Sequence, residues 1–333
     1  MNIPRPLCTK SNIFKGKWTI SANLVAPHYT EMIDKQCPHF HIELNKYVYS
    51  TPFKLSFFET NDDCKVIPLE KSLEIYRKEF GSTEPKVIAV GDSLVQQTIF
   101  AADCDSESFH IGKITSRNHF HRSNYLRHDI PCDFKNCSDP SFVEFWNQPE
   151  RQQHSPCLGC AIAHTVKSSY RNDSLNHKIF PWVYDGSIPN QTDILILDVG
   201  AWISRGHSLS NFSETFKETL ELLAPKIIYL QKTHPNMTIF WQGQRLTPVI
   251  PVDHELQTVP NRNLLAQAIL GPLGVIYLDL YSFSKERVLN DPKCMPDNYH
   301  FMNPGPFAVP SFLWERIMHL FIVEGRWRDK LAV

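Results

Sequence analysis

From residue 86 to the end of the chain, short apolar runs alternate with longer segments of helical periodicity. The apolar runs lie at residues 86–90, 193–199, 237–243 and 275–281, and the helical segments lie at residues 94–102, 212–233, 261–270 and 308–323. Short buried strands that alternate with helices are typical of a parallel sheet covered by helices. The pattern therefore predicts an α/β fold with a central parallel sheet.

The chain divides into two parts. Residues 1–84 contain scattered aromatic residues, prolines and three cysteines, and we expect an irregular lead-in packed on the following domain, with one amphipathic helix over residues 69–80. Residues 85–333 carry the α/β pattern and form one predicted domain. Within that domain, residues 128–190 are polar, rich in proline and contain four cysteines, so we interpret them as an insertion on the sheet.

The first apolar run ends in the turn Gly91-Asp92-Ser93, just before a predicted helix. The common interpretation is a helix cap, because Asp and Ser are favoured at that position. The alternative is a nucleophilic serine at a strand-to-helix turn. Ligands of an open α/β sheet bind outside the carboxyl ends of the strands. Gly200-Ala201-Trp202 and Gly243-Gln244-Arg245 follow two other runs. Three such strand ends at one edge of the sheet favour the interpretation of Ser93 as a nucleophile over that of a helix cap.

A serine hydroxyl needs a base, and the base needs a group that orients it. Asp297 and His300 lie three residues apart in a proline-flanked loop before the last predicted helix. Residues at that spacing face each other in a tight turn, so Asp297 is placed to accept a hydrogen bond from His300. We therefore expect Ser93, His300 and Asp297 to form a catalytic triad, whereas a structural turn with a chance histidine is the alternative.

These motifs resemble those of the SGNH/GDSL hydrolase superfamily. The segments "SNIFKGKW" at 11–18 and "VIAVGDSLVQQ" at 87–97, with the terminal D-x-x-H, are similar to the PC-esterase and trichome-birefringence-like group. The resemblance implies a three-layer, flavodoxin-like α/β fold and a triad that moves acetyl groups on and off glycan hydroxyls. It assigns Ser93 as nucleophile, His300 as general base and then acid, and Asp297 as the orienting residue.

The resemblance also implies an oxyanion hole, for which the backbone N–H groups of Ser93 and Gly200 are candidates. The group's Asn-Thr-Gly-His-Trp strand end is replaced by the sequence from Asp198 to Trp202. An ionised aspartate cannot donate a hydrogen bond. A side-chain donor is then expected from Gln242, Gln244 or Arg245, or is absent.

The expected function is that of an O-acetyltransferase that uses an acyl-serine intermediate, an acetyl donor and a glycan acceptor, without a cofactor. A carbohydrate acetyl esterase with the same triad is an alternative, as is a catalytically inactive glycan-binding homologue, which the change at Asp198 favours. Trp202 and Trp241 are candidates for a sugar platform, although core packing is the commoner use of tryptophan.

Nine cysteines and five N-x-[ST] matches favour an oxidising secretory compartment, either the Golgi lumen or the cell exterior. Asn172, Asn190, Asn211 and Asn236 are candidate glycosylation sites. The competing interpretation is a zinc site formed by Cys132, Cys137, Cys157 and Cys160. The first ten residues contain no apolar signal-peptide core, so we expect a leader or anchor upstream of this sequence.

The overall charge argues against two classes of partner. The formal net charge is −1, so no general field attracts nucleic acid or acidic lipid. No apolar stretch reaches the roughly 18 residues of a membrane helix, so we expect no membrane contact from these residues.

Overall fold

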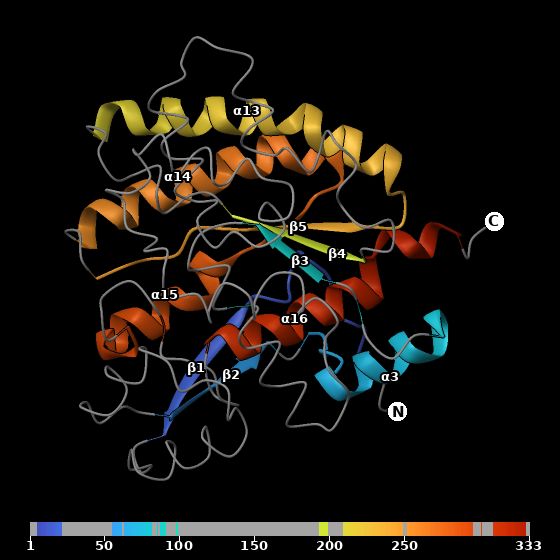
Figure 1. Ribbon diagram of the computed structural model, residues 1–333. Coiled ribbons are helices and arrows are strands. Elements are labelled where there is room, and N and C mark those ends of the chain that lie inside the picture. Colours follow the sequence, from blue (N-terminus) through green and yellow to red (C-terminus); the bar gives the residue numbers. More distant parts are fainter. Residues whose placement is uncertain are drawn as a thin grey trace, which may run out of the picture.

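A parallel sheet lies at the centre of the protein (Figure 1). The computed structural model describes residues 5–21, 55–61, 63–81, 85, 87–90, 98, 193–198, 209–248, 252–295, 301 and 309–330. The sheet contains β3 (Val87–Val90), β4 (Ile194–Leu197), β5 (Thr238–Gln242) and β6 (Ile276–Leu278). Their spatial order is β3-β4-β5-β6, and every neighbouring pair is parallel. The prediction of an α/β fold with a parallel sheet is confirmed.

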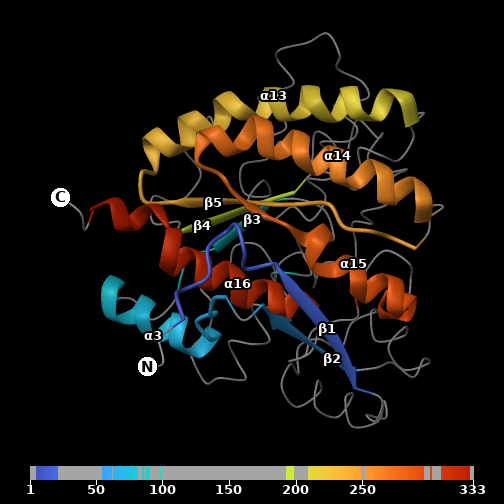
Figure 2. The same ribbon diagram turned by 180° about the vertical axis from the view of Figure 1, so that it is seen from behind.

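Helices cover both faces of this sheet (Figure 2). On one face lie α13 (Leu209–Thr233) and α14 (Val252–Leu270). On the other lie α3 (Leu69–Phe80), α15 (Leu280–Asn290) and α16 (Val309–Glu324). Three short 3₁₀ helices follow α14, α15 and α16, at η3 (Gly271–Leu273), η4 (Pro292–Cys294) and η5 (Arg326–Lys330).

Strand β4 shows why the strands of this sheet are mainly apolar. Ile194 and Ile196 belong to the buried cluster under α16, whereas Leu195 and Leu197 belong to the cluster under α13 and α14. All four side chains are at most 2% exposed. Because successive side chains alternate between two covered faces, apolar residues are favoured at every position of β4.

Two predicted boundaries were wrong. The helix expected over residues 261–270 begins at Val252 and contains Pro260, although proline usually disrupts a helix interior. The strand expected over residues 275–281 ends at Leu278, and α15 begins at Leu280. Asp279 caps that helix, because its Oδ1 accepts a hydrogen bond of 3.0 Å from the Ser282 N–H. The apolar residues Leu280 and Tyr281 therefore belong to a helix.

The lead-in is more regular than predicted. Strands β1 (Gly16–Ser21) and β2 (Leu55–Thr60) form an antiparallel pair, whereas the predicted helix over residues 69–80 matches α3. Trp18 lies directly opposite Phe58, and their ring centroids are 5.3 Å apart. The Trp18 indole N–H donates to the Phe283 carbonyl of α15. The lead-in therefore packs on the helices that cover the sheet.

A buried arginine reinforces this contact. The guanidinium of Arg316 on α16 lies 5.0 Å from the Phe58 ring centroid and 5.2 Å from that of Phe283. It also bonds Glu315 at 3.2 Å and the Thr60 hydroxyl at 3.3 Å. Burial lowers the pKa of Arg316 to about 10, so the side chain remains charged at neutral pH.

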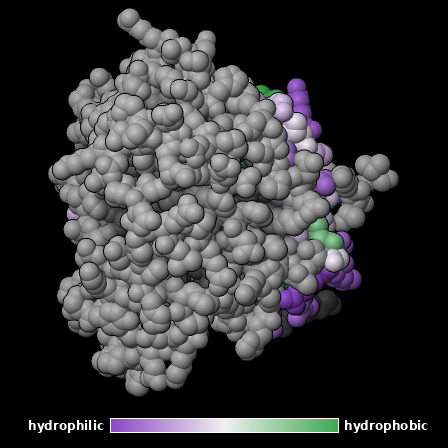
Figure 3. All heavy atoms as spheres, viewed as in Figure 1, coloured by the Kyte–Doolittle hydropathy of each residue, from purple (hydrophilic) through white to green (hydrophobic). Residues whose placement is uncertain are grey.

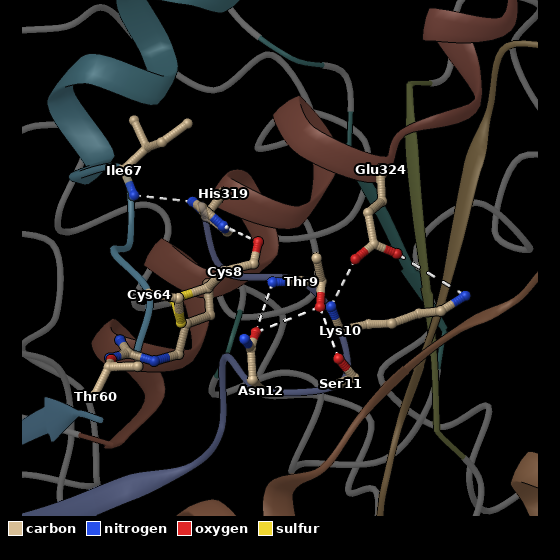
Figure 4. Close-up of a disulfide and its surroundings, with 11 residues drawn as sticks. Cys8, Thr9, Lys10, Ser11, Asn12, Thr60, Cys64, Ile67, His319 and Glu324 are labelled. Carbon is tan, nitrogen blue, oxygen red and sulfur yellow. Dashed lines mark hydrogen bonds and ion pairs between the residues drawn. A yellow bond between two sulfur atoms is a disulfide. The ribbon is translucent and has the colours of Figure 1, made fainter. Parts of the chain in front are cut away.

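A disulfide joins the start of the chain to the segment before α3, and a histidine of α16 contacts both (Figure 4). Cys8 and Cys64 form the disulfide. The Ile67 N–H donates to Nδ1 of His319 at 2.9 Å, and His319 Nε2 lies 2.8 Å from the Cys8 carbonyl oxygen. A backbone N–H only donates and a carbonyl only accepts, so His319 is neutral with its proton on Nε2.

We expect His319 to make stability depend on pH. Its burial lowers its pKa below 6.5, with Arg316 acting in the same direction and the Cys8 carbonyl and Glu324 opposing it. Between the folded-state pKa and 6.5 the unfolded chain binds more protons, so the free energy of unfolding falls as the pH drops through that window. Above pH 6.5 His319 is neutral in both the folded and the unfolded chain, and its contribution to stability is fully present.

The variant His319→Gln tests this, because glutamine supplies one acceptor and one donor but does not titrate. Between about pH 7.5 and pH 5.5, urea unfolding should show a larger loss of stability in the parent than in the variant. Equal losses would mean that His319 does not contribute to the pH dependence.

The described surface visible in Figure 3 is mainly hydrophilic and lies on the side where Figure 1 places α3. Exposed charged residues of α3 include Glu70, Lys71, Glu74 and Lys78. Within the part of the chain that the structure describes, no helix has the length and apolar character needed to span a membrane.

Candidate functional site

Several predicted site residues lie outside the described ranges. These are Ser93, Gly200, Trp202, Asp297 and His300. The insertion at 128–190, with its four cysteines, and the glycosylation candidates Asn172 and Asn190 also lie outside. The triad, the backbone oxyanion donors and the zinc alternative therefore stay predictions.

The described strand ends indicate where those motifs leave the sheet. β3 ends at Val90, three residues before Ser93. Asp198 directly follows β4 and is 1% exposed, and β5 ends at Gln242, which is 0% exposed. Since all strands run in parallel, these ends share one edge of the sheet, the edge at which α/β proteins bind ligands.

One contact joins this edge to the segment that follows the Gly91-Asp92-Ser93 turn. The hydroxyl of Thr98, five residues beyond Ser93, donates a hydrogen bond of 2.9 Å to Oε1 of Gln242. Both residues are buried, at 1% and 0% exposure. The two residues are 144 positions apart in the sequence. Thr98 was not predicted as a site residue, because residues with a hydroxyl group occur at many positions of the chain.

A second contact joins the same edge to the segment that follows the D-x-x-H motif. The guanidinium of Arg245 lies 4.5 Å from the ring centroid of Phe301, which is the residue after His300. Arg245 is 4% exposed and Phe301 is 3% exposed. A cation over a desolvated aromatic face is stabilising by about 2 kcal/mol. Residues next to both predicted motifs thus contact the short segment from Gln242 to Arg245.

A hydrogen-bond network fixes this segment on α14. Asn263 accepts from the backbone N–H of Gln244 at 2.9 Å and donates to the backbone carbonyl of Gln244 at 2.9 Å. Arg262 donates to Oε1 of Gln244 at 3.0 Å. Arg262 and Asn263 were not predictable from the sequence, because only the return of the chain through α14 brings them beside the end of β5.

Gly243, which lies between Gln242 and Gln244, allows the chain to approach Tyr277 and Leu278 of β6 closely. A Cβ atom at this position would clash with the hydroxyl of Tyr277 and would lie 2.9 Å from the Leu278 carbonyl oxygen. Burial raises the pKa of Tyr277 above its ordinary range, and Asp279 and Asp198 raise it further. Tyr277 therefore remains a neutral phenol beside this edge.

Trp241, a candidate for the sugar platform, and Cys294 are both buried in the core. Trp241 is 1% exposed in the core beneath α13, with its ring centroid 6.4 Å from that of Phe216, so it does not form a sugar platform. Cys294 is a buried free thiol whose pKa is raised to about 12, mainly by burial. A thiol with this pKa is a poor nucleophile at neutral pH.

The two remaining glycosylation candidates lie on or beside α13. Asn236 is exposed in the turn before β5, whereas Asn211 lies within α13. Glycosylation of either residue stays a prediction. Among the described residues, no group of three or more His, Cys, Asp or Glu side chains is arranged to hold a metal ion.

Comparison of the chain with protein-family models, with curated proteins and with solved structures finds no match.

Proposed function

We propose that this chain is an SGNH-type O-acetyltransferase that transfers an acetyl group to a glycan hydroxyl through an acyl-serine intermediate. The observation that carries the proposal is the pair of contacts at the end of β5. Thr98, which follows the Gly91-Asp92-Ser93 turn, contacts Gln242, and Phe301, which follows His300, contacts Arg245. Two motifs some two hundred residues apart in sequence thus have neighbours at one edge of the sheet.

The architecture supports this proposal. Helices α13 and α14 cover one face of the parallel sheet and α16 covers the other, as a three-layer, flavodoxin-like arrangement requires. In the sequence, Ser93 comes three residues after the end of β3, and His300 comes before α16. The Cys8–Cys64 disulfide is consistent with a protein of the secretory pathway, because structural disulfides persist in oxidising compartments.

In the proposed reaction, Ser93 Oγ attacks the acetyl carbonyl carbon while His300 accepts the serine proton. Asp297 orients the imidazole and stabilises its positive charge. The C–O bond to the donor alcohol then breaks, and His300 returns the proton to that alcohol. A glycan hydroxyl attacks the acetyl-serine by the reverse sequence, so that the acetyl group moves between oxygens without a cofactor.

The proposal predicts a covalent acetyl adduct on one residue. Incubation with a chromogenic acetyl ester should give a burst of product and a Ser93 peptide whose mass is increased by one acetyl group. Ser93→Ala should show neither. A parent protein that turns over the ester without an adduct on Ser93 would contradict the mechanism.

Addition of an oligosaccharide to the acetylated enzyme separates the two candidate reactions. A transferase should yield acetylated sugar, whereas an esterase should yield acetate, since the outcome depends on how well the acceptor site excludes water. An absence of any adduct, together with retained glycan binding, would instead identify an inactive glycan-binding protein.

A further inference from the structure

The side-chain amide of Gln242 has two ends with different surroundings. Its oxygen accepts the hydroxyl of Thr98 at 2.9 Å. Its Nε2 group, although fully buried, has no hydrogen-bond partner among the residues that the structure describes. An unsatisfied buried donor costs about 1–3 kcal/mol, and such groups call for a functional or structural explanation.

The neighbouring strand cannot supply a donor at the same level of the sheet. Leu197 pairs with Trp241, so Asp198 follows β4 at the level of Gln242 on β5. A carboxylate only accepts hydrogen bonds, whereas an amide nitrogen donates two. Of these two side chains, only the Gln242 amide is therefore able to donate a hydrogen bond to a negatively charged oxygen.

A comparison with Gln244 shows why Gln242 is the better placed amide. Gln244 also has a buried Nε2 without a partner in the described part of the chain, but its oxygen is bound by Arg262 of α14. The oxygen of Gln242 is instead held by Thr98, from the segment that follows Ser93. The Gln242 amide is thus hydrogen-bonded to Thr98, which lies five residues after the proposed nucleophile in the sequence.

We propose that Nε2 of Gln242 donates a hydrogen bond to the acetyl carbonyl oxygen during acyl transfer and that Thr98 is a positioning residue for this amide. The inference rests on the proposed function. As the Ser93 Oγ–C bond forms, the carbonyl oxygen gains negative charge, which Gln242 stabilises. The charge returns to the C=O bond when the bond to the donor alcohol breaks and His300 protonates that alcohol.

Pre-steady-state acylation of Ser93 by a chromogenic acetyl ester tests this role. Loss of one oxyanion donor typically lowers kcat by about 10²–10³-fold. We expect Gln242→Met to lower the acylation rate by about 10²-fold with little change in KM, because the interaction forms only in the transition state. Thr98→Val should lower the rate by a smaller factor, and Thr98→Ser, which keeps the hydroxyl, should restore it.

A matched control is Gln231→Met. The Gln231 amide donates to the Leu273 carbonyl between α13 and η3, so its loss should leave the acylation rate unchanged. Thermal unfolding shows whether each variant folds, and if Gln242→Met does not, the two Thr98 variants decide the question.

Two negative results have different meanings. If the parent acylates Ser93 and either Gln242→Met or Thr98→Val acylates at the parent's rate, the role of the amide is overturned and the proposed function stands. If the parent forms no acetyl-serine, the proposed function fails and this inference fails with it.

Discussion

We expect Ser93→Ala to lower the turnover of an acetyl ester by about 10⁴-fold or more, because it removes the atom that would form the proposed covalent intermediate. His300→Ala should have a similar effect, since a serine hydroxyl is a weak nucleophile without a base. The measurement is kcat/KM for each purified variant, with thermal unfolding to establish that it folds.

The double variant distinguishes a catalytic unit from two independent residues. In the proposed mechanism Ser93 and His300 act in one proton-transfer step, so removing both should lower the rate no more than removing one. Losses that multiply would contradict a shared mechanism.

The parent's activity should also fall as the pH is lowered through the range where imidazole binds a proton, about pH 6.5 for an ordinary histidine.

The second large effect concerns stability. Replacing both Cys8 and Cys64 by alanine should lower the free energy of unfolding by about 4 kcal/mol. Their sequence separation is 56 residues, and closing a loop of that size restricts the unfolded chain by about this amount. Urea unfolding of the paired variant gives the value directly.

Cys294→Ala is the matched control, because Cys294 is also buried but forms no disulfide. Its loss removes one thiol from the core and no cross-link, so its effect should be clearly smaller than that of the paired variant. Equal effects would show that packing of the cysteine side chains, and not the cross-link, stabilises the lead-in.

The strands of the central sheet were predictable because both faces of the sheet are covered. Burial on both faces favours continuous apolar runs, as in β4 and at residues 239–241 of β5, and such runs are visible in sequence. Helix α3 was predictable for a related reason, since Leu69, Leu73 and Tyr76 are buried along one face.

Other elements were missed because their signals are not local. β1 and β2 form only by pairing with each other, and Trp18 meets Phe58 across 40 positions of sequence. The start of α15 was missed because Leu280 and Tyr281 continue the apolar run of β6. Only the capping contact from Ser282 to Asp279 marks the boundary.

The candidate site likewise combines motifs that are visible in the sequence with contacts that only the fold creates. The sequence by itself identified the candidates for acyl transfer, Ser93, His300 and Asp297, which stay predictions, because nucleophile, base and orienting group have recognisable chemistry and neighbours. Only the tertiary structure decided that Thr98 holds the amide of Gln242 and that Arg245 lies over Phe301. Those contacts depend on the order of parallel strands and on the return of the chain across the sheet, which no short stretch of sequence encodes.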